Sequence, residues 1–593
     1  MSLIYIIEVA LGIGLLVFIH ELGHFVLAKL SGVTVERFSI GFGPELLGFT
    51  RGETRYSFRL LPFISYVKML GEEPGSESAA DARSFTAQPY HRKVAIIAAG
   101  TTANILLALV LFVAVFQVGM PFPAAHIGYV EYGAPAFYAG IRPGDRVISI
   151  DGRTDVDFTD LAVKAALADP GEILNLVIER DGRTFPLAVP SEYVPAEGTG
   201  HIGVERYPTL RIEAFLQVDK TEDPVQAAGV ETGSTIISAN GVAMESWTQF
   251  RRFVAANGLE PYSLTVKRAG AERTYEIRPV RNTAPFLNVF ATQTTEVVSI
   301  APGSVADLVG LKAGDVILAV GGKPVSDLHE VRNAINTEPA TLGPLKVKRG
   351  DSTLEIAWTV RPRSGLEFAE ALETATLPRI AWVEPGSAGE FLGLHPGDYL
   401  LSVDGKPVAD FEAFKENLKA STGDTVTLTW RRGDVEMRGA FQPVFLGISP
   451  AVETIERKLG FVASCSMGVR KAWDFASQIY ILLRKAFSGQ AAIAKSLRGP
   501  VAIAQTSYRI AQQGVIQLVF FLAVIGVNLA VMNLLPLPLL DGGLLVLFTV
   551  EKVRGKPLSL AAQAAFQYAG IAIIGALILF ITWQDIYRIV TGG

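Results

Sequence analysis

Four long stretches almost without charged side chains constrain this chain of 593 residues more than any other feature. They are Leu3 to Phe18, Val94 to Val118, Val515 to Leu540 and Ala561 to Ile581. A helix needs about 20 residues to cross the hydrocarbon core of a membrane, so each stretch is long enough or nearly so. A hydrophobic content of 49% and a mean hydropathy of +0.33 agree with this interpretation. We therefore expect a polytopic α-helical membrane protein with about four transmembrane helices, and the length predicts further domains.

Basic residues predict which side of the membrane each loop faces. The segment between the first two stretches contains Arg37, Arg51, Arg55, Arg59, Lys68 and Arg83. The loop after the third stretch contains Lys552, Arg554 and Lys556. Short loops rich in Lys and Arg stay in the cytoplasm. An even number of spans then places both termini and the long 117–513 region on the other side of the membrane.

The remaining composition excludes several classes of function. The formal net charge of −5 is mild, and no basic motif for nucleic acid is present. Cys465 is the single cysteine, so an intrachain disulfide and a cysteine-based metal site are both excluded.

A repeated phrase fills the region between the second and third stretches. Its core is a glycine, a turn that ends in Gly-Asp, and an apolar strand, and it appears around Asp145, Asp315 and Asp398. A weaker copy has Ser234 in place of the aspartate. The period of about 80 to 90 residues is that of a domain rather than a solenoid repeat.

Each copy predicts the same small α+β domain. A short helix ends at glycine, and a strand follows that ends in Asp-Gly, Asn-Gly or Gly-Gly, which favour tight turns. An amphipathic helix comes next, such as Phe411 to Leu418, and two alternating strands close the unit. The phrase resembles the PDZ domain in its bacterial protease-associated form.

We expect a tandem array of about four PDZ-like domains, at 125–205, 210–282, 286–362 and 366–445, of which the second is degenerate. PDZ domains capture extended peptide ends by adding a strand to a sheet edge. The second copy is the least expected to bind, because it has Ser234 where the others have aspartate. The alternative is that some copies are only spacers.

One short motif predicts the chemistry: His20-Glu21-Leu22-Gly23-His24 fits the pattern H-E-x-x-H. Residues four apart share a helix face, so both imidazoles can reach one zinc ion. Glu21 lies beside them and can act as the general base for an attacking water. Ionisable groups near the end of an apolar span are costly and usually functional, which weighs against an accidental match.

Zinc in a hydrolase usually takes three protein ligands, so a third is expected elsewhere. The third apolar stretch ends in Asn533-Leu534-Leu535-Pro536-Leu537-Pro538-Leu539-Leu540-Asp541-Gly542-Gly543. Its two prolines break the helix, and backbone freed in this way at membrane depth is tolerated only inside protein or beside a cavity. Asp541 follows an apolar run and needs a positive partner, which the zinc site supplies. The alternative is an ordinary helix cap on the cytoplasmic side.

Together these motifs resemble the site-2 protease family of intramembrane zinc metalloproteases. With its PDZ-like insertion, the chain is most similar to the bacterial regulator of sigma-E protease subgroup, although it has extra PDZ-like domains. The segments that agree with the family pattern are Gly41-Phe42-Gly43-Pro44, Tyr66-Val67-Lys68-Met69, Ala98-Ala99-Gly100 with Asn104, and Gly499 to Ala504. The departures are Ile64-Ser65 for Gly-Gly, Thr101 for proline and Leu544 for a histidine.

The resemblance implies a function and a role for each site residue. It implies regulated intramembrane proteolysis of single-span membrane proteins, such as an anti-sigma factor already trimmed on its external side. Zn²⁺ is the implied cofactor, with His20, His24 and Asp541 as its ligands and Glu21 as the catalytic base. The residues implied to bind substrate are Asn533, Pro536, Pro538, Gly41 and Gly43.

The expected location is the bacterial inner membrane, with the PDZ-like region in the periplasm. The expected partners are a transmembrane protein substrate, peptide ends at the PDZ-like domains and membrane lipid, without nucleic acid. The first two helices are expected at 1–30 and 94–120, joined by a cytoplasmic or membrane-associated β-hairpin segment at 31–93. A juxtamembrane amphipathic segment is expected at 450–512, and the last two helices at 514–545 and 560–590.

Two other functions fit parts of the sequence. One is a catalytically inactive, membrane-anchored PDZ scaffold, but such a scaffold has no need for His20, Glu21, His24 and Asp541 together. The other is a metalloprotease whose site lies outside the membrane, but that requires a polar helix, and Leu11 to Ile19 is apolar.

Overall fold

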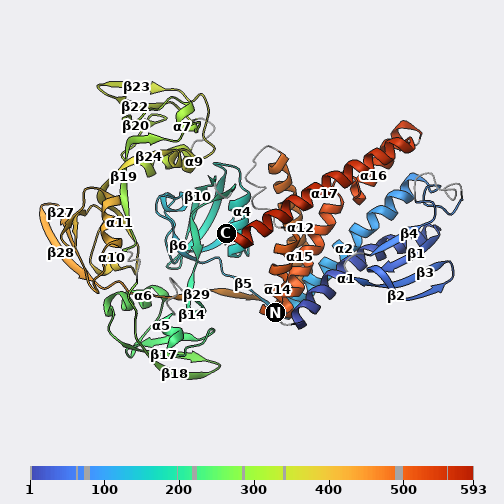
Figure 1. Cartoon of the computed structure of the whole chain (residues 1–593), viewed down its shortest axis with the longest axis horizontal. Helices are drawn as coiled ribbons and strands as arrows, with labels where there is room; N and C mark the ends of the chain where they lie inside the picture. Colours follow the sequence, from blue (N-terminus) through green and yellow to red (C-terminus); the bar gives the residue numbers. More distant parts are fainter. Residues whose placement is uncertain are drawn as a thin grey trace. The chain divides into compact units, whose positions relative to one another are not determined.

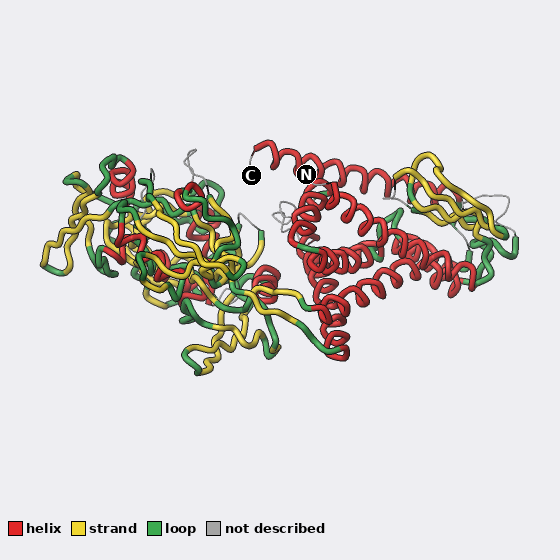
Figure 2. The backbone as a smooth tube through the Cα atoms, turned by 90° about the horizontal axis from the view of Figure 1, so that it is seen from below, coloured by secondary structure: helices red, strands yellow, loops and turns green. Residues whose placement is uncertain are grey.

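The computed structural model divides the chain into two compact units. Unit 1 consists of Met1–Pro121 and Glu456–Gly593, and unit 2 of Phe122–Ile455. The structure describes residues 3–61, 65–72, 81–195, 198–216, 223–282, 287–337, 342–487, 499–556 and 558–591. Helices dominate unit 1 and strands dominate unit 2 (Figure 2).

Three helices of unit 1 are long and apolar enough to cross a membrane among the described residues: α1 (Leu3–Leu30), α2 (Tyr90–Val118) and α15 (Val515–Asn533). They pack closely because glycines lie where they meet. A Cβ at Gly23 of α1 would lie 2.4 Å from the carbonyl oxygen of Ala99 in α2. A Cβ at Gly12 would lie 2.5 Å from Leu522 of α15. The first two predicted spans and the first part of the third are therefore helices in contact with one another.

The other helices that the structure describes in unit 1 are α12 (Phe461–Phe487), α14 (Pro500–Gln513), α16 (Asp541–Arg554) and α17 (Leu560–Thr591) (Figure 1). The third predicted span, 514–545, is not continuous, because α15 ends at Asn533 and a new helix begins at Asp541. The prolines between them explain the break. The fourth predicted span is the single helix α17, and its crossing of a membrane stays a prediction.

A small sheet follows α1, in the strand order β2-β3-β1-β4. Its strands are β1 (Val35–Ile40), β2 (Phe42–Arg51), β3 (Thr54–Leu61) and β4 (Tyr66–Met69). The hairpin expected in this segment is formed by β2 and β3, with its turn at Gly52. The hairpin exposes the apolar side chains of Leu46, Leu47, Phe49, Phe58 and Leu60. Both β2 and β4 are edge strands.

The described residues of unit 2 form four hydrophobic clusters, and each cluster defines one module, numbered 1 to 4 along the chain. Module 1 contains β6 (Ile127–Val130), α3 (Pro135–Tyr138), β7 (Arg146–Ile150), β8 (Arg153–Thr154), α4 (Phe158–Leu167), β9 (Ile173–Arg180), β10 (Arg183–Pro190), β11 (Glu192–Val194), β12 (Thr199–His201) and β13 (Val204–Arg206). Module 2 contains β14 (Pro208–Phe215), α5 (Pro224–Ala227), β15 (Thr235–Ala239), β16 (Val242–Ala243), α6 (Trp247–Asn257), β17 (Tyr262–Arg268) and β18 (Ala271–Ile277).

Modules 3 and 4 share a two-stranded ribbon made of β19 (Val289–Ile300) and β24 (Leu372–Val383). Module 3 adds α7 (Val305–Leu308), β20 (Val316–Val320), β21 (Lys323–Pro324), α8 (Leu328–Thr337), β22 (Leu345–Arg349), β23 (Ser352–Ile356) and α9 (Gly365–Glu370). Module 4 adds α10 (Ala388–Phe391), β25 (Tyr399–Val403), β26 (Lys406–Pro407), α11 (Phe411–Lys419), β27 (Val426–Arg432) and β28 (Val435–Phe441).

Module 2 is completed by a strand from the far end of unit 2. Strand β29 (Ile448–Val452) pairs with β14, and Ile448 packs in the same cluster as Ile212. Modules 3 and 4 are therefore inserted within module 2 along the chain. The chain enters unit 2 through β5 (Met120–Pro123) and leaves through β30 (Thr454–Arg457), which pair with each other.

The repeated Gly-Asp turn has the same contacts in three modules. The aspartate is almost fully buried, and it accepts two hydrogen bonds from an arginine at the end of a later strand. The pairs are Asp145 with Arg180, Asp315 with Arg349 and Asp398 with Arg432. In each pair the arginine also donates to the carbonyl oxygen of the glycine that ends the preceding short helix. The recurring phrase therefore encodes a structural ion pair.

Candidate metal centre

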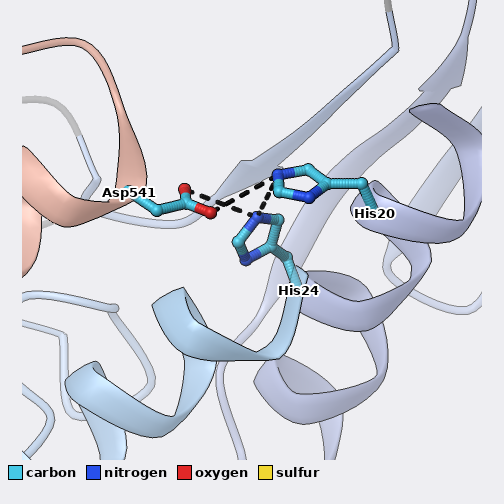
Figure 3. Close-up of side chains that lie close together, drawn as sticks. All are labelled: His20, His24 and Asp541. Atoms are coloured by element: carbon cyan, nitrogen blue, oxygen red, sulfur yellow. Dashed lines mark hydrogen bonds and ion pairs between the residues drawn. The ribbon is translucent and has the colours of Figure 1, made fainter. Parts of the chain in front are cut away.

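Helix α1 brings the two histidines of the H-E-x-x-H motif onto one face. The Nε2 atoms of His20 and His24 are 3.1 Å apart (Figure 3). Their side chains are only 10% and 12% exposed. Because the two Nε2 atoms meet at one point, a single ion can contact both rings.

Asp541 reaches the same point from the start of α16. Its Oδ2 lies 3.4 Å from Nε2 of His20, and its Oδ1 lies 3.7 Å from Nε2 of His24. Only 15% of its side chain is exposed. The structure therefore brings together three residues that the sequence separates by up to 521 positions (541 − 20).

The return of the chain from α15 to α16 positions this aspartate. The segment is tight enough to hold Leu539 at a φ of 73°. A Cβ at Gly542 would lie 2.2 Å from the carbonyl oxygen of Leu534, and a Cβ at Gly543 would lie 2.1 Å from that of Leu537. The two glycines after Asp541 are thus required by the close approach of the backbone.

Helix α2 packs behind the histidines and hydrogen-bonds both. Nδ1 of His24 donates to the carbonyl oxygen of Ile96 at 2.8 Å, which leaves Nε2 of the neutral ring free to bind a metal. His20 hydrogen-bonds the backbone of Gly100 and lies 3.4 Å from Nδ2 of Asn104. Position 100 has no room for a side chain, because a Cβ there would lie 2.3 Å from Nε2 of His24.

Glu21 lies beside the cluster without being part of it. Its carboxylate accepts a hydrogen bond from the backbone N–H of Val67 in β4. It is also close enough to Asp541 for the two carboxylates to repel each other. A carboxylate that lies next to the ligands but is not one of them is suited to accept a proton from a water at the site.

The residues predicted to bind substrate lie in two places. Asn533 ends α15 with its Nδ2 3.4 Å from Nε2 of His20, so it belongs to the cluster. Pro536 and Pro538 lie in the return between α15 and α16. Helix α17 covers this return, because a Cβ at Gly570 would lie 2.3 Å from Cβ of Pro538.

Gly41 and Gly43 lie at the start of β2. The N–H of Gly41 donates to Oγ of Ser65 at 3.4 Å, and the carbonyl oxygen of Gly43 accepts from Arg59 at 2.9 Å. Both glycines have φ angles near +90°, at 93° and 91°, which favours glycine. These two hydrogen bonds therefore link the glycines to the sheet and to the loop before β4 rather than to the metal-ligand cluster. Ile64 lies outside the described residues.

The donor set fits a zinc ion. Within the described part of the chain, one group of at least three His, Cys, Asp or Glu residues meets the geometry for a metal, and it is His20, His24 and Asp541. One ligand atom from each lies within 4.8 Å of the others. Two imidazole nitrogens and a carboxylate oxygen match a catalytic zinc site with one position left for water or substrate.

Sequence reasoning missed two parts of the site. Thr101 stood out only as a departure from proline, yet its Oγ1 donates to Oδ2 of Asp541 at 3.2 Å. Val67 belonged to a matching segment, but nothing in that segment indicated a hydrogen bond to Glu21. The alternation of buried and exposed residues in β4 indicates that Val67 lies in a sheet. It does not indicate that this sheet packs beside α1.

The chain is similar to proteins of one family over nearly its whole length. The family model described as "Peptidase family M50" matches residues 8–577. A "Putative zinc metalloprotease" of Xylella fastidiosa is 25% identical over 578 residues, which cover 96% of this chain and 96% of that protein. The "Regulator of sigma-E protease RseP" of Salmonella typhimurium is 25% identical over 588 residues, which cover 98% of this chain and 97% of that protein. A solved PDZ domain protein of Parabacteroides distasonis, 10% identical, aligns over 57% of this chain and 99% of its own with a TM-score of 0.13.

Proposed function

Because this chain belongs to peptidase family M50, we propose that it cleaves single-span membrane proteins inside the lipid bilayer. It is a zinc metalloprotease of the site-2 type and an inner-membrane protein. The observation that carries the proposal is the meeting of His20, His24 and Asp541 among apolar helices. Burying charged and ionisable groups among apolar membrane helices costs free energy, so such groups usually have a function.

The roles of the residues follow from their positions. The zinc ion would be held by His20, His24 and Asp541. When bound, zinc acts as a Lewis acid that lowers the pKa of a water molecule to near neutral pH. Glu21 accepts the proton of the attacking water and returns it to the leaving amine. Asn533, whose amide donates toward the cluster, hydrogen-bonds the substrate carbonyl oxygen as negative charge develops there.

An intact transmembrane helix hides its amides in its own hydrogen bonds, so the substrate must unwind before cleavage. The β1–β4 sheet offers a means to hold it extended. Its edge strand β4 contacts Glu21 through Val67, and the other edge strand, β2, begins at the glycines predicted to bind substrate. We propose that the unwound segment adds to an edge of this sheet and so passes the base.

The modules of unit 2 are proposed to act as PDZ-like domains in the periplasm. Module 1 has a groove of about 310 Å³ between α4 and residues 199–205. Its walls are the apolar side chains of Phe158, Leu161 and Ala165 on one side and β13 on the other. Among the described strands β13 pairs with β6 alone, so its second edge can take an extended peptide end.

The experiment that tests the protease function is cleavage of a purified single-span substrate in detergent. We expect cleavage, its loss with a zinc chelator and its recovery when zinc is returned. We also expect about one zinc per chain. A folded protein that holds stoichiometric zinc but cuts no membrane substrate would favour the inactive PDZ scaffold. Reporters fused after Arg51 or Lys556 should be cytoplasmic, and a cytoplasmic reporter within unit 2 would contradict the periplasmic placement.

A further inference from the structure

We propose that Thr101 is a positioning residue that holds the carboxylate of Asp541 in place to bind the zinc ion. This inference rests on the proposed metal centre. Thr101 is 2% exposed, and its Oγ1 donates to Oδ2 of Asp541 at 3.2 Å. The same Oδ2 lies 3.4 Å from Nε2 of His20, so the hydroxyl contacts the carboxylate oxygen that faces His20.

Asp541 needs such a contact more than the two histidines do. His20 and His24 project from the middle of α1, and their backbone is fixed by the helix. Asp541 is the first residue of α16 and follows a return that contains two prolines and Leu539 at a positive φ. A hydrogen bond to a neighbouring helix fixes a carboxylate ligand and limits its rotation.

Helix α2 thus contacts all three proposed ligands within two turns. The carbonyl oxygen of Ile96 accepts from His24, the backbone of Gly100 hydrogen-bonds His20, and Thr101 donates to Asp541. Of these three contacts, the one from Thr101 alone comes from a side chain of α2, and Nδ2 of Asn104 adds a side-chain contact to His20 at 3.4 Å. A proline at this position has no hydroxyl to donate, so the departure from the family pattern adds this contact.

The test compares three variants of the full chain in detergent. Thr101→Val removes the hydroxyl and keeps the shape, and Thr101→Ser keeps the hydroxyl. Thr102→Val is the matched control, because the Thr102 hydroxyl is exposed and bonds Ala98 of its own helix at 2.7 Å. The measurements are zinc affinity by competition with a chelator and the visible absorption spectrum of the Co²⁺-substituted protein.

We expect Thr101→Val to weaken zinc binding about 10- to 100-fold and to shift the cobalt spectrum. Thr101→Ser and Thr102→Val should match the unmodified protein in both measurements. Equal affinities and spectra for the two valine variants would overturn the inference. An Asp541→Ala variant then distinguishes a wrong metal centre from a wrong role for Thr101. If Asp541→Ala also binds zinc normally, the proposed metal centre is wrong. If Asp541→Ala loses zinc, only the role of Thr101 is rejected.

A different observation in unit 2 carries a second inference independently of zinc. We infer that the β11–β12 hairpin of module 1 is an internal ligand of module 3, held by α8 and the start of α9. The carboxylate of Glu192 is fully buried against α8 of module 3. It accepts from Nε of Arg332 at 2.7 and 2.9 Å, from Nη2 of the same arginine, and from Nδ2 of Asn336 at 2.8 Å.

The next residue of the hairpin contacts the start of α9. The carbonyl oxygen of Tyr193 accepts from Oγ of Ser364 at 2.7 Å, and the guanidinium of Arg363 lies 4.2 Å from the ring centre of Tyr193. Asn336 joins the two helices, because its Oδ1 accepts from the N–H of Gly365 at 2.7 Å. Helix α8 and the start of α9 therefore hold a short extended segment and its carboxylate together.

The charge of Glu192 suits this place. Burial alone would raise the pKa of Glu192, but hydrogen bonds from His201, Arg332 and Asn336 hold that pKa below its ordinary value. The carboxylate therefore stays ionised and paired at neutral pH. The inference implies that this face of module 3 is closed to outside peptides while the hairpin stays in place.

The test uses the full chain with Glu192→Ala, the milder Glu192→Gln, and Glu355→Ala as an exposed control in module 3. A labelled peptide with the sequence of residues 189–195 is the probe. We expect it to bind the Glu192→Ala protein and not the unmodified or Glu355→Ala proteins. Hydrogen exchange of α8 and β11 should rise in both Glu192 variants, and less in Glu192→Gln.

Binding of the peptide to the unmodified protein, or unchanged exchange in α8 for both Glu192 variants, would overturn the inference. Loss of binding in a Glu192→Ala/Arg332→Ala double variant is expected, since Arg332 supplies most of the contacts to the carboxylate. Neither measurement depends on proteolysis, so failure of the proposed cleavage function would leave this result intact.

Discussion

Both units bury aspartates, but the two sets are built differently. In unit 2, three aspartates bind arginines that follow them by 35, 34 and 34 residues within the same module. In unit 1, Asp541 meets histidines and a threonine that come from two other helices, the threonine 440 residues away in the chain. The contact that recurs at fixed spacing serves the fold of each module, whereas the contact around Asp541 occurs once and joins distant segments, as the proposed metal centre requires.

Module 2 shows what the recurring pair contributes. Ser234 takes the place of the aspartate, and Arg268, at the position of the paired arginine, instead contacts Glu231 at the surface. Both partners are more than half exposed, at 51% and 63%, so this pair contributes little to stability. Module 2 also differs from module 1 in the last strand that it takes. In module 2 the distant strand β29 pairs with β14, whereas in module 1 the module's own strand β13 pairs with β6.

The largest expected effect breaks the site in unit 1. Glu21→Gln should lower the rate of substrate cleavage by about 10²- to 10⁴-fold, because it removes the base. Zinc content should stay near one per chain, because Glu21 is not among the proposed ligands. Glu8→Gln, at the other end of α1, is the control and should cleave normally. A Glu21→Gln protein with full activity would show that another group takes the proton.

The next effect tests how the two units work together. We expect unit 2 to exclude substrates that still have a bulky external domain, so a shortened substrate should be cut faster than an intact one. Deletion of residues 128–443 should reduce this difference and leave zinc binding unchanged. If the modules only recruit substrate, the deletion should slow cleavage of both forms equally. A preference that survives the deletion would reject the gating role.

A smaller effect is expected from breaking one recurring pair. Burial would raise the pKa of Asp315, but its hydrogen bonds from Arg349 and from the backbone of Lys312 lower that pKa below the ordinary value. Asp315→Asn should therefore reduce the unfolding free energy of module 3 by about 2–3 kcal/mol at pH 7. Hydrogen exchange of β20 and β22 in the full chain measures this change in unfolding free energy.

The pH dependence of that effect has a definite sign. A carboxylate whose pKa is lowered by folding stabilises the folded state above its unfolded pKa, which is about 3.9. This stabilisation disappears as the pH falls through the lower, folded pKa. The difference in stability between the unmodified protein and the Asp315→Asn variant should therefore shrink below about pH 4. A difference that stays constant with pH would mean that the substitution disturbs packing rather than charge.

Sequence reasoning succeeded where a signal is local or repeated. The spacing of His20 and His24 indicates a shared helix face, and the Gly-Asp turns indicate three similar modules before any contact is known. The family assignment from these motifs is confirmed over residues 8–577. The interrupted third span follows from its prolines.

The parts that escaped prediction depend on how distant segments pack. The hydrogen bond from Thr101 to Asp541 forms only if α2 and α16 have a particular offset along their axes and a particular rotation relative to each other. No local pattern in either segment specifies these two quantities. The pairing of β29 with β14 likewise joins segments more than 230 residues apart, with Ile212 opposite Pro450. Strand alternation indicates which face of a strand is buried but not which partner it chooses.

The smallest expected effect sharpens the comparison by restoring the missing pair in module 2. Ser234 is 1% exposed at the place where other modules hold a buried aspartate, and Arg268 is close enough to pair with Glu231 beside it. Ser234→Asp should draw Arg268 away from that exposed partner and raise the stability of module 2 by less than about 1 kcal/mol, since one weak pair is exchanged for a better one that must lose its hydration. Hydrogen exchange of β15 and β17 measures the change, and Ser234→Asn is the control that adds similar volume without charge. If the aspartate variant is less stable than the asparagine variant, module 2 has adapted to the absence of the pair, and its copy of the repeated phrase has a structural role different from that in the other three modules.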